Sequence, residues 1–80
     1  VIRSRHQDRP EGSYTTHLFE SGLDKIKKKL GEEAVEMILA QQRDEMVHEA
    51  ADLIYHLLVL LEASSISWDE VLMELSGRAG

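Results

Sequence analysis

Acidic side chains recur at a helical spacing in two parts of this 80-residue chain. Glu33 and Glu36 are separated by i,i+3, as are Glu49 and Asp52, and residues at that spacing share one face of an α-helix. If the two segments pair as an antiparallel hairpin that turns at residues 42–43, Glu36 lies level with Glu49. Glu33 lies level with Asp52 in the same arrangement. The spacing therefore predicts that the four carboxylates converge.

Such a group of carboxylates is costly unless a cation lies among them. Two unit charges about 5 Å apart repel by about 3 kcal/mol at an effective dielectric constant near 20, whereas a small domain has a total stability of about 5–15 kcal/mol. A divalent ion would relieve this repulsion. Oxygen ligands favour hard cations, so we expect Mg²⁺, with Mn²⁺ as a substitute. The alternative is a solvated acidic helix face, and spacing alone does not decide between the two.

Helices must position these side chains, and the apolar pattern predicts four of them. Ser13 is the expected N-cap of the first helix, and Gly22 ends it. Asp44 is the expected cap of the third helix. Ser67 and Glu70 form a capping box, Ser-x-x-Glu, before the last helix. The expected ranges are 13–20, 24–42, 44–63 and 67–75, and the second and third helices form the hairpin.

The segment Leu53 to Leu61 is apolar on nearly every helix face. A helix of this kind must be covered on all sides, and four short helices provide too little material to do so. A second copy of the chain is the natural cover, so we expect a homodimer with this helix at its centre. The fold class is therefore all-α: an antiparallel helix hairpin with flanking short helices, completed by homodimerisation.

Several residues within the predicted helices are assigned to the core. His56 is expected to be a buried histidine with its hydrogen bonds satisfied, or to orient Asp52 through a hydrogen bond. Gly31 lies inside a helix, where glycine costs about 1 kcal/mol, so its presence predicts a close approach of another group. The remaining expected core residues are Met37, Trp68, Leu72 and Met73.

Composition excludes several classes of protein. The net charge of −6 and the pI near 5.1 argue against nucleic-acid binding, because an acidic surface repels phosphate backbones. With no cysteine, disulfide scaffolds, cysteine-zinc sites and thiol catalysis are excluded. The longest apolar segment is far shorter than the roughly 20 residues of a membrane span. We expect one domain over residues 1–80, in the cytoplasm, with no membrane partner and no phosphate-binding glycine loop.

Four segments resemble phosphoribosyl-ATP pyrophosphohydrolases, the second enzymes of histidine biosynthesis. They are Pro-Glu-Gly-Ser-Tyr-Thr (10–15), Lys-Lys-Leu-Gly-Glu-Glu-Ala-Val-Glu (28–36), Glu-Ala-Ala-Asp-Leu-Ile-Tyr-His-Leu-Leu-Val-Leu-Leu (49–61) and Ser-Trp-Asp-Glu-Val-Leu (67–72). The acidic pattern is shared with the wider MazG-type nucleotide pyrophosphohydrolases. The segments at 12–15 and 55–61 favour the histidine-pathway family. Members of that family usually have more of a first helix before the segment that matches residues 1–5.

The resemblance implies a MazG-like helical bundle that hydrolyses phosphoribosyl-ATP to phosphoribosyl-AMP and pyrophosphate. Magnesium would neutralise the triphosphate and lower the pKa of bound water. Glu32 is a further ligand or the base that orients water. As a hypothesis, the magnesium ligands are Glu33, Glu36, Glu49 and Asp52.

The basic run before the acids suggests how a polyphosphate would be held. Lys29 corresponds to a lysine of the family motif and is the favoured phosphate contact, with Lys25 a weaker candidate. Lys27 and Lys28 are interpreted as a solvated face. Ser13, Tyr14 and Thr15 either begin a helix or help to hold the ribose phosphate.

Three other functions compete with this one. A MazG-type hydrolase of other nucleoside triphosphates would keep the same metal site. A di-iron helical protein is suggested by a single Glu-x-x-His motif, Glu45 to His48, which a dimer would duplicate. A non-catalytic helical dimerisation module would gain no thermal stability from a metal and would release no pyrophosphate.

Overall fold

A computed structural model of the chain describes residues 14–79, which form four α-helices and contain no strand. The helices are α2 (Tyr14–Ser21), α3 (Leu23–Leu39), α4 (Arg43–Ala63) and α5 (Trp68–Ala79). The predicted all-α class is therefore confirmed. The expected helix cap at Ser13 lies outside the described residues.

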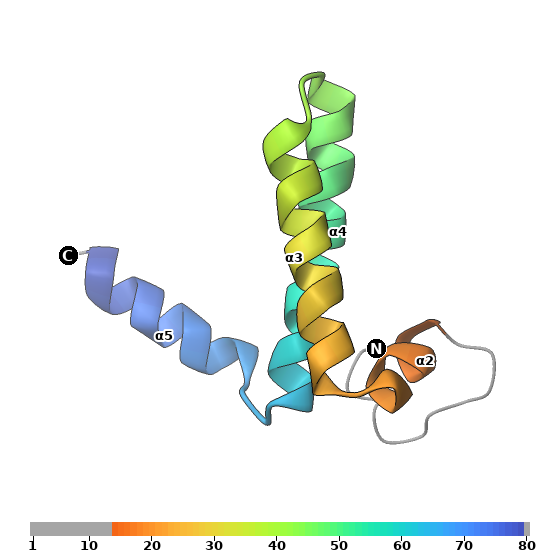
Figure 1. Cartoon of the computed structure of the whole chain (residues 1–80). Helices are drawn as coiled ribbons and strands as arrows, with labels where there is room; N and C mark the ends of the chain where they lie inside the picture. Colours follow the sequence, from red (N-terminus) through yellow and green to blue (C-terminus); the bar gives the residue numbers. More distant parts are fainter. Residues whose placement is uncertain (1–13, 80) are drawn as a thin grey trace.

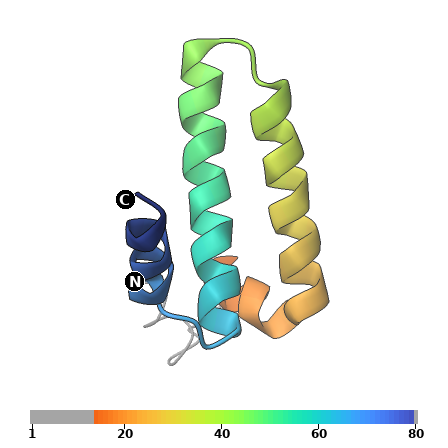
Figure 2. The same ribbon diagram turned by 90° about the vertical axis from the view of Figure 1, so that its left-hand side faces the viewer.

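Helices α3 and α4 form the predicted antiparallel hairpin and run side by side over most of their length (Figures 1 and 2). The short helix α2 packs against both of them near the end of the hairpin opposite its loop. Gly22 is the only residue between α2 and α3, and its φ of 93° permits the sharp change of direction. Helix α5 leaves the end of α4 at a bend of 112° and extends away from the hairpin.

The hydrophobic core lies where α2 meets the hairpin. Leu18 and Phe19 of α2 pack with Ile26 of α3 and Val59 of α4, and all four side chains are buried. Tyr55 and two further residues of α4, Leu60 and Ala63, pack against this cluster. The core thus fixes α2 on the hairpin and leaves the region near the loop with little apolar cover.

The hairpin loop comprises residues 40–42 and is earlier in the chain than predicted. Helix α3 ends at Leu39 because Ala40 has extended backbone angles, φ −64° and ψ 132°. The N-cap of α4 is Gln42, so the predicted cap at Asp44 is wrong. Asp44 lies in the first turn instead, where a carboxylate interacts favourably with the helix dipole. This earlier loop changes which carboxylates meet across the hairpin.

The start of α5 is as predicted and its packing is not. The Ser67 backbone N–H donates to Glu70 Oε2 at 2.8 Å, and the Glu70 N–H donates to Ser67 Oγ at 3.2 Å, which confirms the capping box. The helix continues to Ala79, beyond the predicted end at residue 75. Trp68, Leu72 and Met73 are exposed, because α5 has little contact with the other helices.

Other apolar side chains also face solvent within this single chain. A Cβ at Gly31 would meet nothing within 4 Å, so no part of the described chain approaches it closely, and the approach of another group there stays a prediction. Val35 and Ile38 lie on the same stripe of α3 and are 53% and 79% exposed. Ile54, at the centre of the predicted dimer helix, is 51% exposed. The homodimer stays a prediction.

No single helix in residues 14–79 has the length and apolarity needed to cross a membrane. The bent pair of α4 and α5 meets those criteria of length and composition only when the two helices are taken together.

Candidate active site

Three of the predicted carboxylates come together where α3 faces α4. Glu33 and Glu36 of α3 and Glu49 of α4 each present an oxygen atom, and these atoms all lie within 4.8 Å of one another. The i,i+3 spacing puts both α3 carboxylates on the side that faces α4. Glu49 approaches both of them, rather than Glu36 alone, because the loop is earlier than predicted.

Two oxygens of this group are buried without a hydrogen-bond partner, Glu33 Oε2 and Glu49 Oε2. Glu33 as a whole is only 4% exposed. Unpaired buried carboxylate oxygens are strongly unfavourable. A hydrogen bond with Glu49, followed by the charge of Glu33, raises the pKa of Glu36 above its ordinary value of 4.5. The residues present fit a bound cation, since one ion would supply both orphaned oxygens with a partner and relieve the repulsion.

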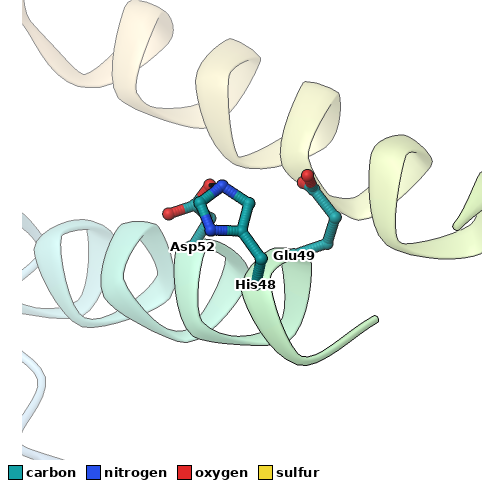
Figure 3. A group of neighbouring side chains, drawn as sticks. All are labelled: His48, Glu49 and Asp52. Atoms are coloured by element: carbon teal, nitrogen blue, oxygen red, sulfur yellow. Dashed lines mark ion pairs between the residues drawn. The ribbon is translucent and has the colours of Figure 1, made fainter. Parts of the chain in front are cut away.

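Asp52 belongs to a second, overlapping group on α4. His48, Glu49 and Asp52 also have ligand atoms within 4.8 Å of one another. His48 Nε2 lies 3.3 Å from Asp52 Oδ2, and the Glu49 carboxylate points toward α3 (Figure 3). Asp52 thus adjoins the carboxylate cluster through Glu49.

His48 was not predicted to lie near the carboxylates. Its i,i+4 spacing to Asp52 was the signal that could have placed it there. Glu45 is in neither group, so the Glu-x-x-His pattern that suggested a di-iron site is not part of a cluster of three or more ligand residues in the described chain.

A pocket of about 420 Å³ lies between α2 and α3, beside the carboxylate cluster. Its α3 wall carries three lysines and one acid, and its α2 wall begins at Tyr14. The lining residues are Tyr14, His17, Leu18, Ser21, Lys25, Lys28, Lys29 and Glu32. In a chain with a net charge of −6, this concentration of cations is local and suits an anion. Lys28, interpreted from the sequence as part of a solvated face, is in fact part of this wall.

Lys29 contacts both the pocket and the acidic cluster. It lines the pocket, and its Nζ lies 3.1 Å from Glu33 Oε1. This hydrogen bond with Glu33 raises the pKa of Lys29 above its ordinary value of 10.5, so the ammonium is charged at neutral pH. Lys25 lines the pocket as well. Lys27 is exposed and does not.

The residues predicted at the start of the first helix have different surroundings in the structure. Tyr14 lines the pocket, and its hydroxyl is hydrogen-bonded to His56 Nε2 at 2.9 Å. Thr15 is buried, and its hydroxyl pairs with that of Tyr55, which removes Thr15 from the surface that a substrate could reach. Ser13 lies outside the described residues.

His56 is the buried, satisfied histidine that the sequence predicted, being 5% exposed with both ring nitrogens paired. Its Nδ1 bonds to the backbone carbonyl of Asp52 at 2.7 Å. This hydrogen bond to Asp52 reaches the backbone and not the carboxylate. Glu32 is exposed and faces the pocket instead of the carboxylate cluster.

Comparison with known proteins identifies the family of this chain. A model of the phosphoribosyl-ATP pyrophosphohydrolase family matches residues 1–79. The chain belongs to this family. The phosphoribosyl-ATP pyrophosphohydrolase motifs quoted from the sequence, at 28–36 and 49–61, include all the carboxylates of the two candidate metal-binding groups.

Individual relatives cover nearly all of the chain. A phosphoribosyl-ATP pyrophosphatase of Listeria welshimeri is 52% identical over 81 residues, which is 99% of this chain and 79% of that protein. One from Ignicoccus hospitalis is 45% identical over 82 residues. A histidine biosynthesis bifunctional protein of Pyrococcus furiosus is 50% identical over 78 residues. The chain spans only 37% of the length of that bifunctional relative.

Proposed function

We propose that this chain is a phosphoribosyl-ATP pyrophosphohydrolase that uses Mg²⁺ to convert phosphoribosyl-ATP and water into phosphoribosyl-AMP and pyrophosphate. Its family membership and two relatives named phosphoribosyl-ATP pyrophosphatase support the substrate. Mn²⁺ would substitute for Mg²⁺, because both are hard cations that accept oxygen ligands. The reaction belongs to histidine biosynthesis, and we expect it to take place in the cytoplasm.

One observation supports this function more than any other: a cationic pocket adjoins a cluster of carboxylates that contains two orphaned buried oxygens. A triphosphate chain is a polyanion, and hydrolysis of its anhydride requires both cationic neutralisation and an activated water. The lysine pocket provides the first of these. The carboxylate cluster is suited to hold the ion that serves both needs. Neither feature alone distinguishes a phosphoanhydride hydrolase from a salt-bridged helical bundle.

The carboxylates divide into ligands and a candidate base. Glu33, Glu36 and Glu49 would hold the ion, and Asp52 would extend the ligand set through its contact with Glu49. When bound, Mg²⁺ supplies charge neutralisation and lowers the pKa of coordinated water. Glu32 is assigned as the base that orients water, because it is exposed in the pocket wall and lies outside the carboxylate cluster.

The lysines hold the polyphosphate in place. Lys25, Lys28 and Lys29 lie along one face of α3 and would each meet phosphate oxygens as point charges. Lys29 is also paired with Glu33, so the position of its ammonium is set by the cluster. A phosphate bound by Lys29 would therefore lie next to the metal ligands, where the anhydride must be for hydrolysis.

Pyrophosphate release from phosphoribosyl-ATP, measured with Mg²⁺ and again with excess EDTA, tests this function. We expect release only with the metal. The same assay with ATP and dUTP separates the histidine-pathway reaction from that of a MazG-type hydrolase with another substrate. A higher kcat/KM for an ordinary triphosphate would contradict the assignment of phosphoribosyl-ATP. No metal-dependent release from any of the three would contradict hydrolysis itself.

We also propose that the chain acts as a homodimer. Two apolar stripes stay exposed along the hairpin: Val35 and Ile38 on α3, and Val47 and Ile54 on α4. Monomeric proteins rarely leave contiguous apolar surface of this kind uncovered. A second copy would cover the α4 stripe, and the exposed Gly31 beside Val35 would allow a partner helix to approach closely. Nucleic acid and membrane are not expected partners.

A further inference from the structure

A continuous chain of hydrogen bonds connects the pocket wall with the helix turn that carries Asp52. His56 Nδ1 bonds to the Asp52 backbone carbonyl at 2.7 Å, and His56 Nε2 bonds to the Tyr14 hydroxyl at 2.9 Å. The imidazole is 5% exposed and makes edge-on contacts with the rings of Tyr14 and Tyr55. It therefore fixes Tyr14 of α2 against α4.

The direction of these hydrogen bonds follows from the chemistry of the groups. A backbone carbonyl only accepts, so His56 Nδ1 is a donor, and in the neutral form of the imidazole this N–H is the only one. Nε2 then has a lone pair and no proton, and it can only accept. The Tyr14 hydroxyl must consequently donate its single proton to His56. A phenol that has committed its proton has only oxygen lone pairs left for any other partner.

The surroundings of Tyr14 keep the phenol in this protonated form. Partial burial is the largest cause that raises its pKa above the ordinary value of 10.0, and the charges of Glu33 and Asp52 act in the same direction. Lys29 opposes them and lowers the pKa, without reversing the direction of the shift. At neutral pH the group is therefore an uncharged phenol.

We propose that Tyr14 is a specificity-determining residue that accepts a hydrogen bond from a sugar hydroxyl of the nucleotide, and that His56 is the positioning residue that holds it in this role. Tyr14 lines the same pocket as the three lysines. Unlike the lysines, its hydroxyl has no proton left to donate to a phosphate oxygen. Phosphate oxygens at neutral pH are acceptors, and so is the remaining face of the Tyr14 oxygen. A hydroxyl group of the substrate is a donor and fits it.

This inference rests on the proposed function and refines the prediction that Tyr14 holds the ribose phosphate. The pocket would have two kinds of recognition: lysines for the polyphosphate and Tyr14 for the sugar. An inorganic polyphosphate would use only the lysines. A nucleotide would use both, so the contribution of Tyr14 should be visible as a difference between the two classes of ligand.

Equilibrium binding by calorimetry, with EDTA present to prevent turnover, measures this difference. The ligands are phosphoribosyl-ATP and inorganic tripolyphosphate, which has no sugar. Tyr14→Phe should weaken phosphoribosyl-ATP by about fivefold to tenfold, the usual effect of one lost hydrogen bond. The affinity for tripolyphosphate should change by less than about twofold. Tyr55→Phe is the matched control, because it removes a neighbouring, partly buried hydroxyl of a residue that does not line the pocket.

The role of His56 is tested by combining variants. If His56 acts through Tyr14, His56→Gln weakens phosphoribosyl-ATP but not tripolyphosphate, and the double variant binds no more weakly than Tyr14→Phe alone. A merely structural role would weaken both ligands. Equal weakening of the two ligands by Tyr14→Phe, no effect on either, or no binding of either by the wild-type chain would each overturn the proposal.

The activity of the wild-type chain is measured separately with Mg²⁺. Failure to release pyrophosphate from phosphoribosyl-ATP there would contradict the proposed function. The binding comparison would still give its own result, because it requires no turnover. The two failures are therefore distinguishable.

Discussion

Lys29 Nζ lies 3.1 Å from Glu33 Oε1, and this ion pair joins the cationic pocket to the carboxylate cluster. Glu33 is buried and has a second oxygen without a partner. The Lys29 side chain, which lines the pocket, is 37% exposed. The pair therefore places a positive charge next to the proposed metal ligands, and one oxygen of Glu33 is left over. A polyphosphate that contacts Lys29 would be brought directly to the cluster.

Replacement of Lys29 should impair substrate binding more than replacement of a nearby lysine. Lys29→Met removes both the proposed phosphate contact and the partner of Glu33, so we expect kcat/KM for phosphoribosyl-ATP to fall by about tenfold to a hundredfold, the range for hydrogen bonds to charged groups. Lys27→Met is the matched control, since Lys27 is on the same helix but outside the pocket. Equal effects of the two variants in steady-state assays would contradict the role of Lys29.

The carboxylate repulsion should appear in the pH dependence of stability without metal. The folded pKa of Glu36 is raised, chiefly by its hydrogen bond with Glu49 and by the charge of Glu33. Protonated Glu36 thus favours the folded state, and ionisation becomes destabilising as the pH rises above the ordinary value of 4.5. In EDTA, Glu36→Gln should raise Tm at pH 8 and change it little at pH 4.

A second acidic residue provides the contrast for this measurement. Glu45 lies in the first turn of α4, where its negative charge is favourable. Glu45→Gln should therefore lower Tm slightly at pH 8, opposite in sign to Glu36→Gln. Mg²⁺ should raise the Tm of the wild-type chain more than that of Glu36→Gln. If Glu36→Gln lowered Tm at pH 8 without metal, the repulsive cluster would be excluded.

The exposed stripe on α4 should determine the oligomeric state. Ile54→Glu places a charge where the proposed dimer is apolar, and Ile54 is already half exposed in the single chain. We expect sedimentation velocity to give a dimer for the wild-type chain and a monomer for this variant. Glu20→Gln, an exposed change on α2, should leave the mass unchanged. A wild-type chain that sediments as a monomer would contradict the proposed homodimer.

The capping box should stabilise α5 locally. Ser67→Ala removes the side-chain oxygen that accepts from the Glu70 N–H, which costs about 1 kcal/mol at a typical N-cap. Hydrogen exchange of the α5 amides should become faster, with little change in α3 and α4, because α5 has few contacts with them. Unchanged exchange in α5 would indicate that the cap does not limit its opening.

Much of the fold was predictable because local patterns determine it. Helical spacing identified all four helices in the described chain, and the capping box placed the start of α5. The loop was misplaced because Gln42 and Arg43 have no strong capping preference, whereas Asp44 does. An error of one or two residues in the position of a loop changes which residues lie opposite each other along the whole hairpin. As a result, Glu49 meets Glu33 as well as Glu36.

The site was predictable where one helix face carries it and less so where separate helices meet. Spacing brought Glu33 and Glu36 together and would have paired His48 with Asp52. It could not place Tyr14 against His56, because that contact joins residues far apart in the sequence through the packing of α2. Nor could spacing reveal that Trp68 and Leu72 are exposed, since periodicity identifies an apolar face but not what covers it.

Magnesium titration of pyrophosphate release by Glu49→Gln is the most direct test of the central claim that the clustered carboxylates hold the catalytic ion. Glu49 has an oxygen within 4.8 Å of an oxygen of each acid of α3, and it carries one of the orphaned oxygens. We predict that, relative to the wild-type chain and to Glu45→Gln, this variant needs at least tenfold more Mg²⁺ for half-maximal release from phosphoribosyl-ATP or is inactive, as for a lost metal ligand. Wild-type activity at an unchanged magnesium requirement would contradict the claim.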